Sequence, residues 1–269
     1  MESVSMSDTV ASGVEDFPSS IRRYPYKGKN DLSTIMSYES SLGDQNDMFL
    51  ITNINKHRFE TDFLDTDNKF KEYFHSSQLL VIKMASYPHE IAGRTFAGHV
   101  VSEVGLMGTQ NTLRNPGGWC LDLLSSNKCP DESFLPRRLQ GRGHPTVVIE
   151  TARSESASKL KNDAARWLLS SNNEVQAVIT IHLDRNEAIT IKRWGRQNGQ
   201  AVVQEETCIF KEYGSARSAR PTPQVTRAPF TIPYADLYLR QAQPSTNERD
   251  IQISQEQLLD VADAAWAGI

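Results

Sequence analysis

Apolar residues occur in short, dense runs along the second half of the chain, a pattern that predicts strands. Residues 79–82, 145–150 and 175–183 are almost continuously apolar, which is typical of strands buried on both faces of a sheet. Two further strands are expected at residues 188–194 and 201–210, because Asn198-Gly199 between them is a hairpin signal. The central part of the chain is therefore predicted to form a sheet.

Apolar residues at helical spacing predict helices over residues 86–107 and 157–171, and a last helix beginning at Ser254. In the first helix the apolar face begins at Glu90, and in the second the core stripe consists of Leu160, Ala164, Trp167 and Leu168. Together with the strands, the order is helix, three strands, helix, strand. This order predicts an α/β fold, with a mixed sheet and flanking helices. Short helices are also expected near residues 31–41 and 66–74.

Composition shifts divide the chain into four expected parts. The parts are a mobile N-terminal tail over residues 1–30, an α/β domain over 31–213, a loop or linker over 214–228, and a C-terminal helical extension packing on the core over 229–269.

Composition narrows the classes of protein that the chain can belong to. No run approaches the roughly 20 apolar residues of a membrane span, and the N-terminus lacks signal-peptide features, so we expect no membrane partner and a cytoplasmic or nuclear location. The formal net charge of −4 provides no general attraction to polyanions. Three cysteines without a C-x-x-C pair are expected to be reduced structural thiols.

Two carboxylates are the best candidates for chemistry. Asp131 follows Pro130 at the expected start of a strand, and Glu150 ends the apolar strand over residues 145–150. Adjacent strands would bring both acids to one edge of the sheet, where hard oxygen ligands can hold Mg²⁺. Such an ion would polarise a phosphate and lower the pKa of an attacking water. Glu90 is either an outer metal ligand or a first-turn acid that the helix dipole favours.

Basic side chains near these acids complete the candidate site. Lys161 is expected on the flank of its helix that faces the sheet, where it could stabilise developing negative charge, whereas Lys159 should point toward solvent. A local basic patch consists of Arg137, Arg138 and Arg142. This patch either contacts nucleic acid or is a solvated loop.

Across residues 80–194 the sequence resembles the PD-(D/E)XK nuclease-like superfamily, especially its small fungal and bacterial members of unknown role. The stretches that carry the resemblance are residues 130–136, 145–150, 154–156, 163–168 and 175–194. The resemblance implies a restriction-endonuclease-like αβββαβ core with Asp131 and Glu150 as catalytic metal ligands. Ala152 stands where the superfamily usually has its lysine, and the resemblance implies a migrated lysine on the following helix, for which Lys161 fits best.

Three functions are compatible with these residues. The first is a Mg²⁺-dependent nuclease or phosphodiesterase acting on nucleic acid. The second is a catalytically inactive binding or regulatory protein on the same scaffold, to which Ala152 and the acidic net charge point. The third is a scaffold recruited for a reaction of specialised metabolism, which would have a small-molecule pocket near Glu150 and no positive groove leading to it.

Overall fold

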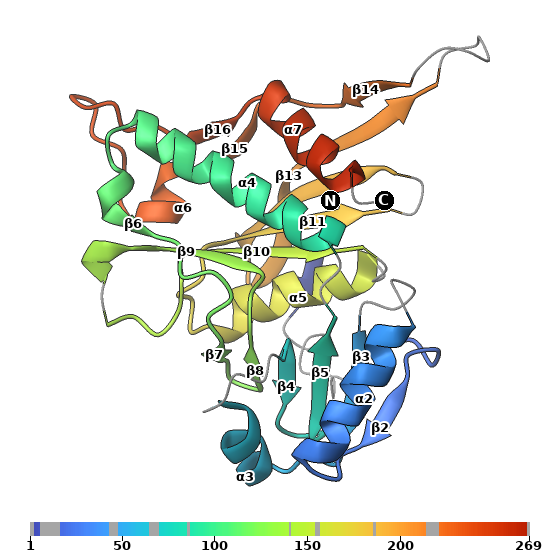
Figure 1. Cartoon of the computed structure of the whole chain (residues 1–269). Helices are drawn as coiled ribbons and strands as arrows, with labels where there is room; N and C mark the ends of the chain where they lie inside the picture. The colour runs from blue at the N-terminus through green and yellow to red at the C-terminus, as the bar shows by residue number, and fades with distance from the viewer. Residues whose placement is uncertain are drawn as a thin grey trace.

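Two β-sheets, flanked by helices, organise the chain (Figure 1). The computed structural model describes residues 3–5, 17–42, 48–64, 70–84, 87–139, 141–153, 157–184, 187–213 and 221–267. One sheet has eight strands and a second has six, and both mix parallel and antiparallel pairs, while two strands near the C-terminus form a third, antiparallel sheet. The predicted class, mixed α/β with flanking helices, is confirmed.

The large sheet contains both strands that carry or adjoin the predicted acids, β9 and β10. Only β10 and β11 pair in parallel among its strands, and every residue of β10 is buried. The strand order is β1 (Ser3–Ser5), β13 (Gln200–Glu212), β12 (Ile189–Gln197), β11 (Ala177–Leu183), β10 (Val147–Ala152), β9 (Glu132–Pro136) and β6 (Leu113–Arg114), with β14 (Thr222–Val225) paired to β13.

Helices cover both faces of the large sheet, which explains why its central strands are apolar throughout. Helices α4 (Tyr87–Leu106) and α7 (Gln255–Trp266) lie on one face, and α5 (Ala157–Ser170) lies on the other (Figure 1). Because side chains alternate along a strand, Ile149 packs in the cluster of α4 and α7, whereas Val148 packs in the cluster of α5. The order α4, β6, β9, β10, α5, β11 matches the predicted αβββαβ core.

The small sheet lies on the α5 side of the large one (Figure 1). Its hairpin of β7 and β8 is inserted in the chain between β6 and β9, so this hairpin ties the two sheets together. The strand order is β2 (Arg23–Pro25), β3 (Met48–Thr52), β5 (Leu79–Lys83), β4 (Glu72–Phe74), β8 (Ser126–Lys128) and β7 (Leu121–Asp122), and the sheet is accompanied by α2 (Lys29–Ser41), α3 (Lys56–Phe59) and the π-helical turn Glu60–Leu64.

The first eighty residues differ most from the predicted pattern. Within the range expected to be a tail, Arg23–Pro25 form β2 and Phe17 is buried. A helix was expected at residues 66–74, but Glu72–Phe74 form strand β4, and residues 65–69 lie outside the described part. Pairing of β4 with β5 and β8 decides this segment, because tertiary pairing outweighs a weak local preference.

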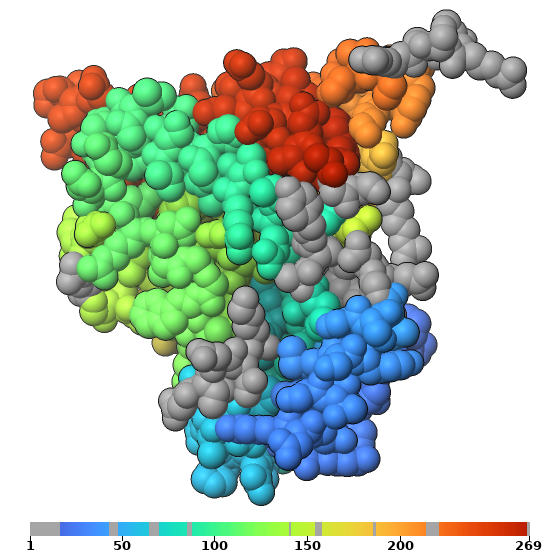
Figure 2. All heavy atoms as spheres, viewed as in Figure 1, coloured from blue at the N-terminus to red at the C-terminus, as the bar shows by residue number. Residues whose placement is uncertain are grey.

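The C-terminal part packs against α4, at the opposite end of the molecule from residues 17–64 (Figure 2). It contains β15 (Phe230–Ile232), α6 (Tyr234–Tyr238), β16 (Ile251–Ile253) and α7. The predicted start of the last helix is confirmed, because Ser254 and Gln257 form a reciprocal capping box. No helix among the described residues is long and apolar enough to cross a membrane.

Cys120 and Cys129 form a disulfide, so the expectation of three reduced cysteines is wrong for this pair. Leu121 pairs with Lys128 in the β7–β8 hairpin, and the next position outward in that register places Cys120 beside Cys129. Their Cα atoms are 4.0 Å apart. Cys208 is a free cysteine. The pairing follows from the hairpin register, which cysteine spacing alone does not reveal.

Candidate functional site

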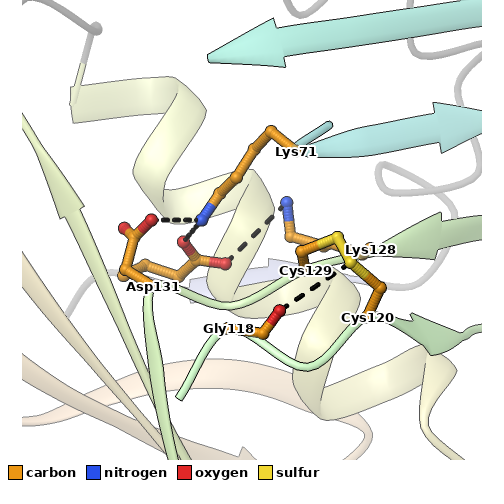
Figure 3. Close-up of a disulfide and its surroundings, with 7 residues drawn as sticks. Lys71, Gly118, Cys120, Lys128, Cys129 and Asp131 are labelled. Carbon is orange, nitrogen blue, oxygen red and sulfur yellow. Dashed lines mark hydrogen bonds and ion pairs between the residues drawn. A yellow bond between two sulfur atoms is a disulfide. The ribbon is translucent and has the colours of Figure 1, made fainter. Parts of the chain in front are cut away.

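The carboxylates of Asp131 and Glu150 converge on one ammonium group, that of Lys71. The Lys71 Nζ atom lies 2.7 Å from Asp131 Oδ1 and 2.6 Å from Glu150 Oε2. Figure 3 shows Lys71 and Asp131 pointing toward one another, beside the disulfide. Lys71 immediately precedes strand β4 of the small sheet. The two acids predicted to meet at one sheet edge therefore do meet there, with a lysine between them.

Backbone pairing at the sheet edge holds Asp131 in place. Its N–H donates to the carbonyl of Ile149 at 3.2 Å, and its Oδ2 atom accepts the N–H of Thr151 at 2.7 Å. The Asp131 carboxylate thus replaces the carbonyl that β9 would offer if its ladder with β10 continued. A side chain fixed in this way has little freedom to rotate toward another ligand.

Two further cationic or ionisable groups surround Asp131. Lys83, at the end of β5, has its Nζ 3.3 Å from Asp131 Oδ2 and donates to the Thr151 carbonyl at 2.8 Å. His89, in the first turn of α4, has its Nε2 3.3 Å from Asp131 Oδ2 and 2.5 Å from the same carbonyl. Because a carbonyl oxygen only accepts, the Nε2 atom carries a hydrogen.

Glu150 also contacts α5. The indole N–H of Trp167 donates to its Oε1 atom at 2.6 Å, and Lys128 Nζ lies 3.9 Å from the same atom. Since Lys71 contacts Oε2, both carboxylate oxygens have donors or cations beside them. The Glu150 side chain is only 2% exposed.

A second layer of buried charges continues behind Glu150 and joins the two sheets. Lys128 Nζ lies 2.8 Å from both Glu72 Oε2 and Asp163 Oδ1. Arg166 contacts the same two acids, at 3.2 Å and 2.6 Å. An isolated charge is very costly to bury, so removing one partner of a buried ion pair leaves the other charge uncompensated. The network therefore depends on the exact apposition of both sheets with α5.

Protonation at the pair follows from burial and from the neighbouring cations. Burial alone would raise the pKa of Asp131, but Lys71, Lys83 and His89 outweigh it and hold that pKa well below its usual value. For Glu150, burial raises the pKa despite the opposing effect of Lys71 and Lys128. Burial lowers the pKa of Lys71, but Asp131 and Glu150 outweigh this and raise it. Lys71 and Asp131 therefore form a stable ion pair.

The Mg²⁺ ion that the sequence resemblance implies does not fit this arrangement. The ammonium of Lys71 lies at the point between the acids that a shared metal ion would need. The remaining oxygens accept the Thr151 N–H and the Trp167 indole N–H. Across the described ranges, no group of three or more His, Cys, Asp or Glu side chains could hold a metal ion.

A cavity of about 900 Å³ opens beside Asp131. Among the described residues that line it, Glu150 does not occur, so Lys71 and Asp131 separate Glu150 from this space. The polar lining comes from Lys71, Lys83, His89, Glu90, Arg94, Asp131 and Glu132, and the apolar lining from Phe63, Leu64, Phe70, Trp119, Pro130 and the Cys120–Cys129 disulfide.

The other predicted acid and lysines occupy different surroundings. Glu90 lines the cavity with Asp131, and its carboxylate lies 3.2 Å from the guanidinium of Arg94. Lys161 is half-buried on α5 and is not among the described residues that line the cavity. Lys159 was expected to point to solvent, but it is 4% exposed and its Nζ lies 2.8 Å from Asp163. This expectation is wrong because the small sheet covers that side of α5.

Two of the three arginines in the predicted basic patch donate hydrogen bonds to backbone carbonyls. Arg138 donates to the carbonyl of Tyr238, and Arg142 donates to the carbonyl of Glu174 at 2.8 Å. Arg137 is exposed in the 3₁₀ turn Arg137–Leu139. None of these arginines is among the described residues that line the cavity beside Asp131.

Sequence reasoning missed Lys71, Lys83 and Lys128, which surround the two acids. All three are contributed by the small sheet, outside any motif of the resemblance. A faint signal existed for Lys83, because a lysine directly after an apolar run places a charge at a strand end. The usual lysine position, Ala152, is fully buried in β10. The cations next to the acids are supplied by another part of the chain.

Comparisons with known proteins identify a weak structural similarity. No protein-family description matches the sequence, and no curated protein matches it. Among solved structures, the chain is similar to a DUF820 protein from Anabaena variabilis that is described as a candidate nuclease. The two sequences are 14% identical, the match covers 78% of this chain and 99% of that one, and the TM-score is 0.45. The observed fold and site define a mixed α/β protein with a lysine-bridged carboxylate pair beside a cavity.

Proposed function

We propose that this chain is a non-hydrolytic protein that binds a small molecule on a nuclease-like αβββαβ core. The observation that carries the proposal is the position of Lys71, whose ammonium contacts Asp131 at 2.7 Å and Glu150 at 2.6 Å. A lysine at this point neutralises the acids that would otherwise attract a divalent cation. The adjoining cavity would then bind a small molecule.

Access to the acids supports the proposal. A phosphodiesterase of this kind needs both carboxylates on one ion that also contacts the substrate. Glu150 is 2% exposed and faces Trp167 and Lys128, away from the cavity. Only Asp131 of the two acids reaches the space that a substrate could enter.

Charge and size also favour a small molecule. Arg138 and Arg142 donate to backbone carbonyls, and the net charge is −4, so a path for a polyanion to Asp131 has little support. A volume of about 900 Å³ lies within the roughly 300–1,000 Å³ of ligand pockets in proteins.

The Mg²⁺-dependent nuclease is the second candidate, and one observation favours it. Lys71 contacts both acids, so it could replace the lysine that is missing at Ala152. In that case Lys71 would have to leave the point between the carboxylates when a metal ion arrives. Glu90 would then be the further acid at the cavity.

Calorimetry and cleavage assays separate the two functions. With the purified full-length chain, we expect no saturable heat of Mg²⁺ binding and no cleavage of single-stranded or double-stranded DNA or RNA. Mg²⁺-dependent cleavage that disappears in both Asp131→Ala and Glu150→Ala would overturn the proposal. Glu60→Ala, which removes an exposed acid outside the cavity lining, is the matched control for the loss of one negative charge.

A further inference from the structure

We infer that the ligand of the cavity is a small organic anion with a flat apolar body, its anionic group bound by Lys83, a hydroxyl bound by His89 Nδ1, and its body packed against Trp119. This inference names the ligand class and rests on the proposed small-molecule function. Three independent features of the cavity point to this chemistry: a lysine with a remaining donor, a buried ring nitrogen without a hydrogen-bond partner in the described part of the chain, and an aromatic wall.

Lys83 has donor capacity left for an anion. An ammonium group has three N–H donors, and the acceptors of Lys83 in the described part of the chain are Asp131 Oδ2 and the carbonyl of Thr151. The Lys83 side chain is 10% exposed and lines the cavity. A carboxylate or sulfonate beside it would gain a charge-assisted hydrogen bond.

His89 is the second observation that points to a ligand. It lines the cavity and is 4% exposed, and its Nε2 donates to the Thr151 carbonyl. Its Nδ1 atom is buried and has no hydrogen-bond partner among the described residues. Buried polar atoms in proteins normally have a partner. In the tautomer that carries its hydrogen on Nε2, this nitrogen is an acceptor and can bind a ligand hydroxyl.

The acidic lining residues disfavour an anionic group beside them. Glu90 is engaged by Arg94 at 3.2 Å, and the Glu132 carboxyl also lines the space. Asp131 already contacts Lys71 and Lys83. An anion is therefore best placed beside Lys83, and away from Glu90 and Glu132.

An aromatic wall completes the cavity. Phe63 and Phe70 are buried in the core of the small sheet and line the space with one side. Trp119 is 56% exposed and also lines it. Gly117 positions the loop before this tryptophan, since its φ of +63° favours glycine and its N–H donates to Asn115 Oδ1. Large exposed aromatic surface beside a cavity is suited to a flat ligand.

Two fluorescent probes with the same aromatic body test the inference. The probe 8-anilinonaphthalene-1-sulfonate carries an anion, and N-phenyl-1-naphthylamine is its uncharged counterpart. With the full chain we expect saturable binding of one anionic probe per molecule, at least about tenfold tighter than the neutral probe, as one charge-assisted hydrogen bond predicts. In Lys83→Met the affinity for the anionic probe should fall to that for the neutral one, whereas Lys56→Met, which removes an exposed lysine of α3, should leave both unchanged.

A second variant keeps the test decisive if Lys83→Met fails to fold. Trp119→Ala removes an exposed side chain and should lower the affinity for both probes about equally, while the circular dichroism spectrum stays unchanged. Equal affinity for both probes in the wild type, or binding of the anionic probe that neither variant alters, would overturn the inference. Nucleic-acid cleavage by the same preparations would contradict the proposed function only, because the probe comparison is read independently of cleavage.

Discussion

The ammonium of Lys71 lies 2.6 Å from Glu150 Oε2, although Lys71 precedes a strand of the small sheet and Glu150 lies in the large one. This contact closes Glu150 off from the cavity beside Asp131 and places a fixed positive charge between two acids. It therefore affects both stability and ligand choice, and the following experiments separate these effects.

Removal of the bridging lysine should destabilise the protein and create affinity for a divalent cation. Lys71→Met leaves Asp131 and Glu150 facing one another without the shared cation, a loss that costs about 3–5 kcal/mol for a buried pair. Urea unfolding measures this loss, with Lys56→Met as the control within about 0.5 kcal/mol of wild type. Calorimetry should then detect Mn²⁺ or Mg²⁺ binding to Lys71→Met only. An unchanged unfolding midpoint would refute the role of Lys71.

Replacing both partners should cost less than replacing one. In Lys71→Met/Glu150→Leu, apolar residues replace both the buried lysine and the buried glutamate, and Asp131 keeps its ion pair with Lys83. Apolar replacement of a whole buried pair is often close to neutral. We expect the double variant to recover at least about half of the stability that Lys71→Met loses. Strictly additive losses in a double-mutant cycle would contradict coupling between the two residues.

The Asp131 carboxyl should make stability fall in acid. Its pKa is held well below the usual value, because Lys71, Lys83 and His89 outweigh the effect of burial. A depressed folded-state pKa stabilises the protein above the unfolded-state value of about 3.9, and this stabilisation is lost as the pH falls toward the folded-state value. Urea unfolding between about pH 5 and pH 2 should therefore show a smaller decline for Asp131→Asn than for wild type. Parallel declines would show that Asp131 does not titrate in this way.

The Cys120–Cys129 disulfide should contribute to stability and to the shape of the cavity. Closing a loop with a sequence separation of 9 is worth about 2–3 kcal/mol in the loop-entropy relation. Cys120→Ser/Cys129→Ser should lower the unfolding free energy by this amount and weaken the aromatic probes, because both cysteines line the cavity. Cys208→Ser is the control, since that thiol is free. If dithiothreitol lowers the unfolding free energy of wild type and of Cys208→Ser no more than that of the double variant, the disulfide is absent in solution.

The strands and helices of the large sheet could be predicted from the sequence because their signals are local. The apolar run that became β10 and the capping residues of α7 each depend on neighbouring residues, so periodicity was sufficient to place them. The meeting of Asp131 and Glu150 was also predictable, since a loop and return strand join them. In the small sheet, the apolar run over residues 79–82 was predicted as a strand, but β4 and β8 were not, because each has three residues and their pairing with one another joins segments distant in sequence.

The sequence by itself determined the order of the core elements and which two acids meet at the edge of the large sheet. Only the tertiary structure decided which cation stands between those acids. Lys71 is 60 residues from Asp131, and no motif spans that distance, so the contact exists only after the two sheets pack across α5. The physical reason is that backbone periodicity acts over a few residues, whereas the pairing of buried charges is a property of the assembled interior.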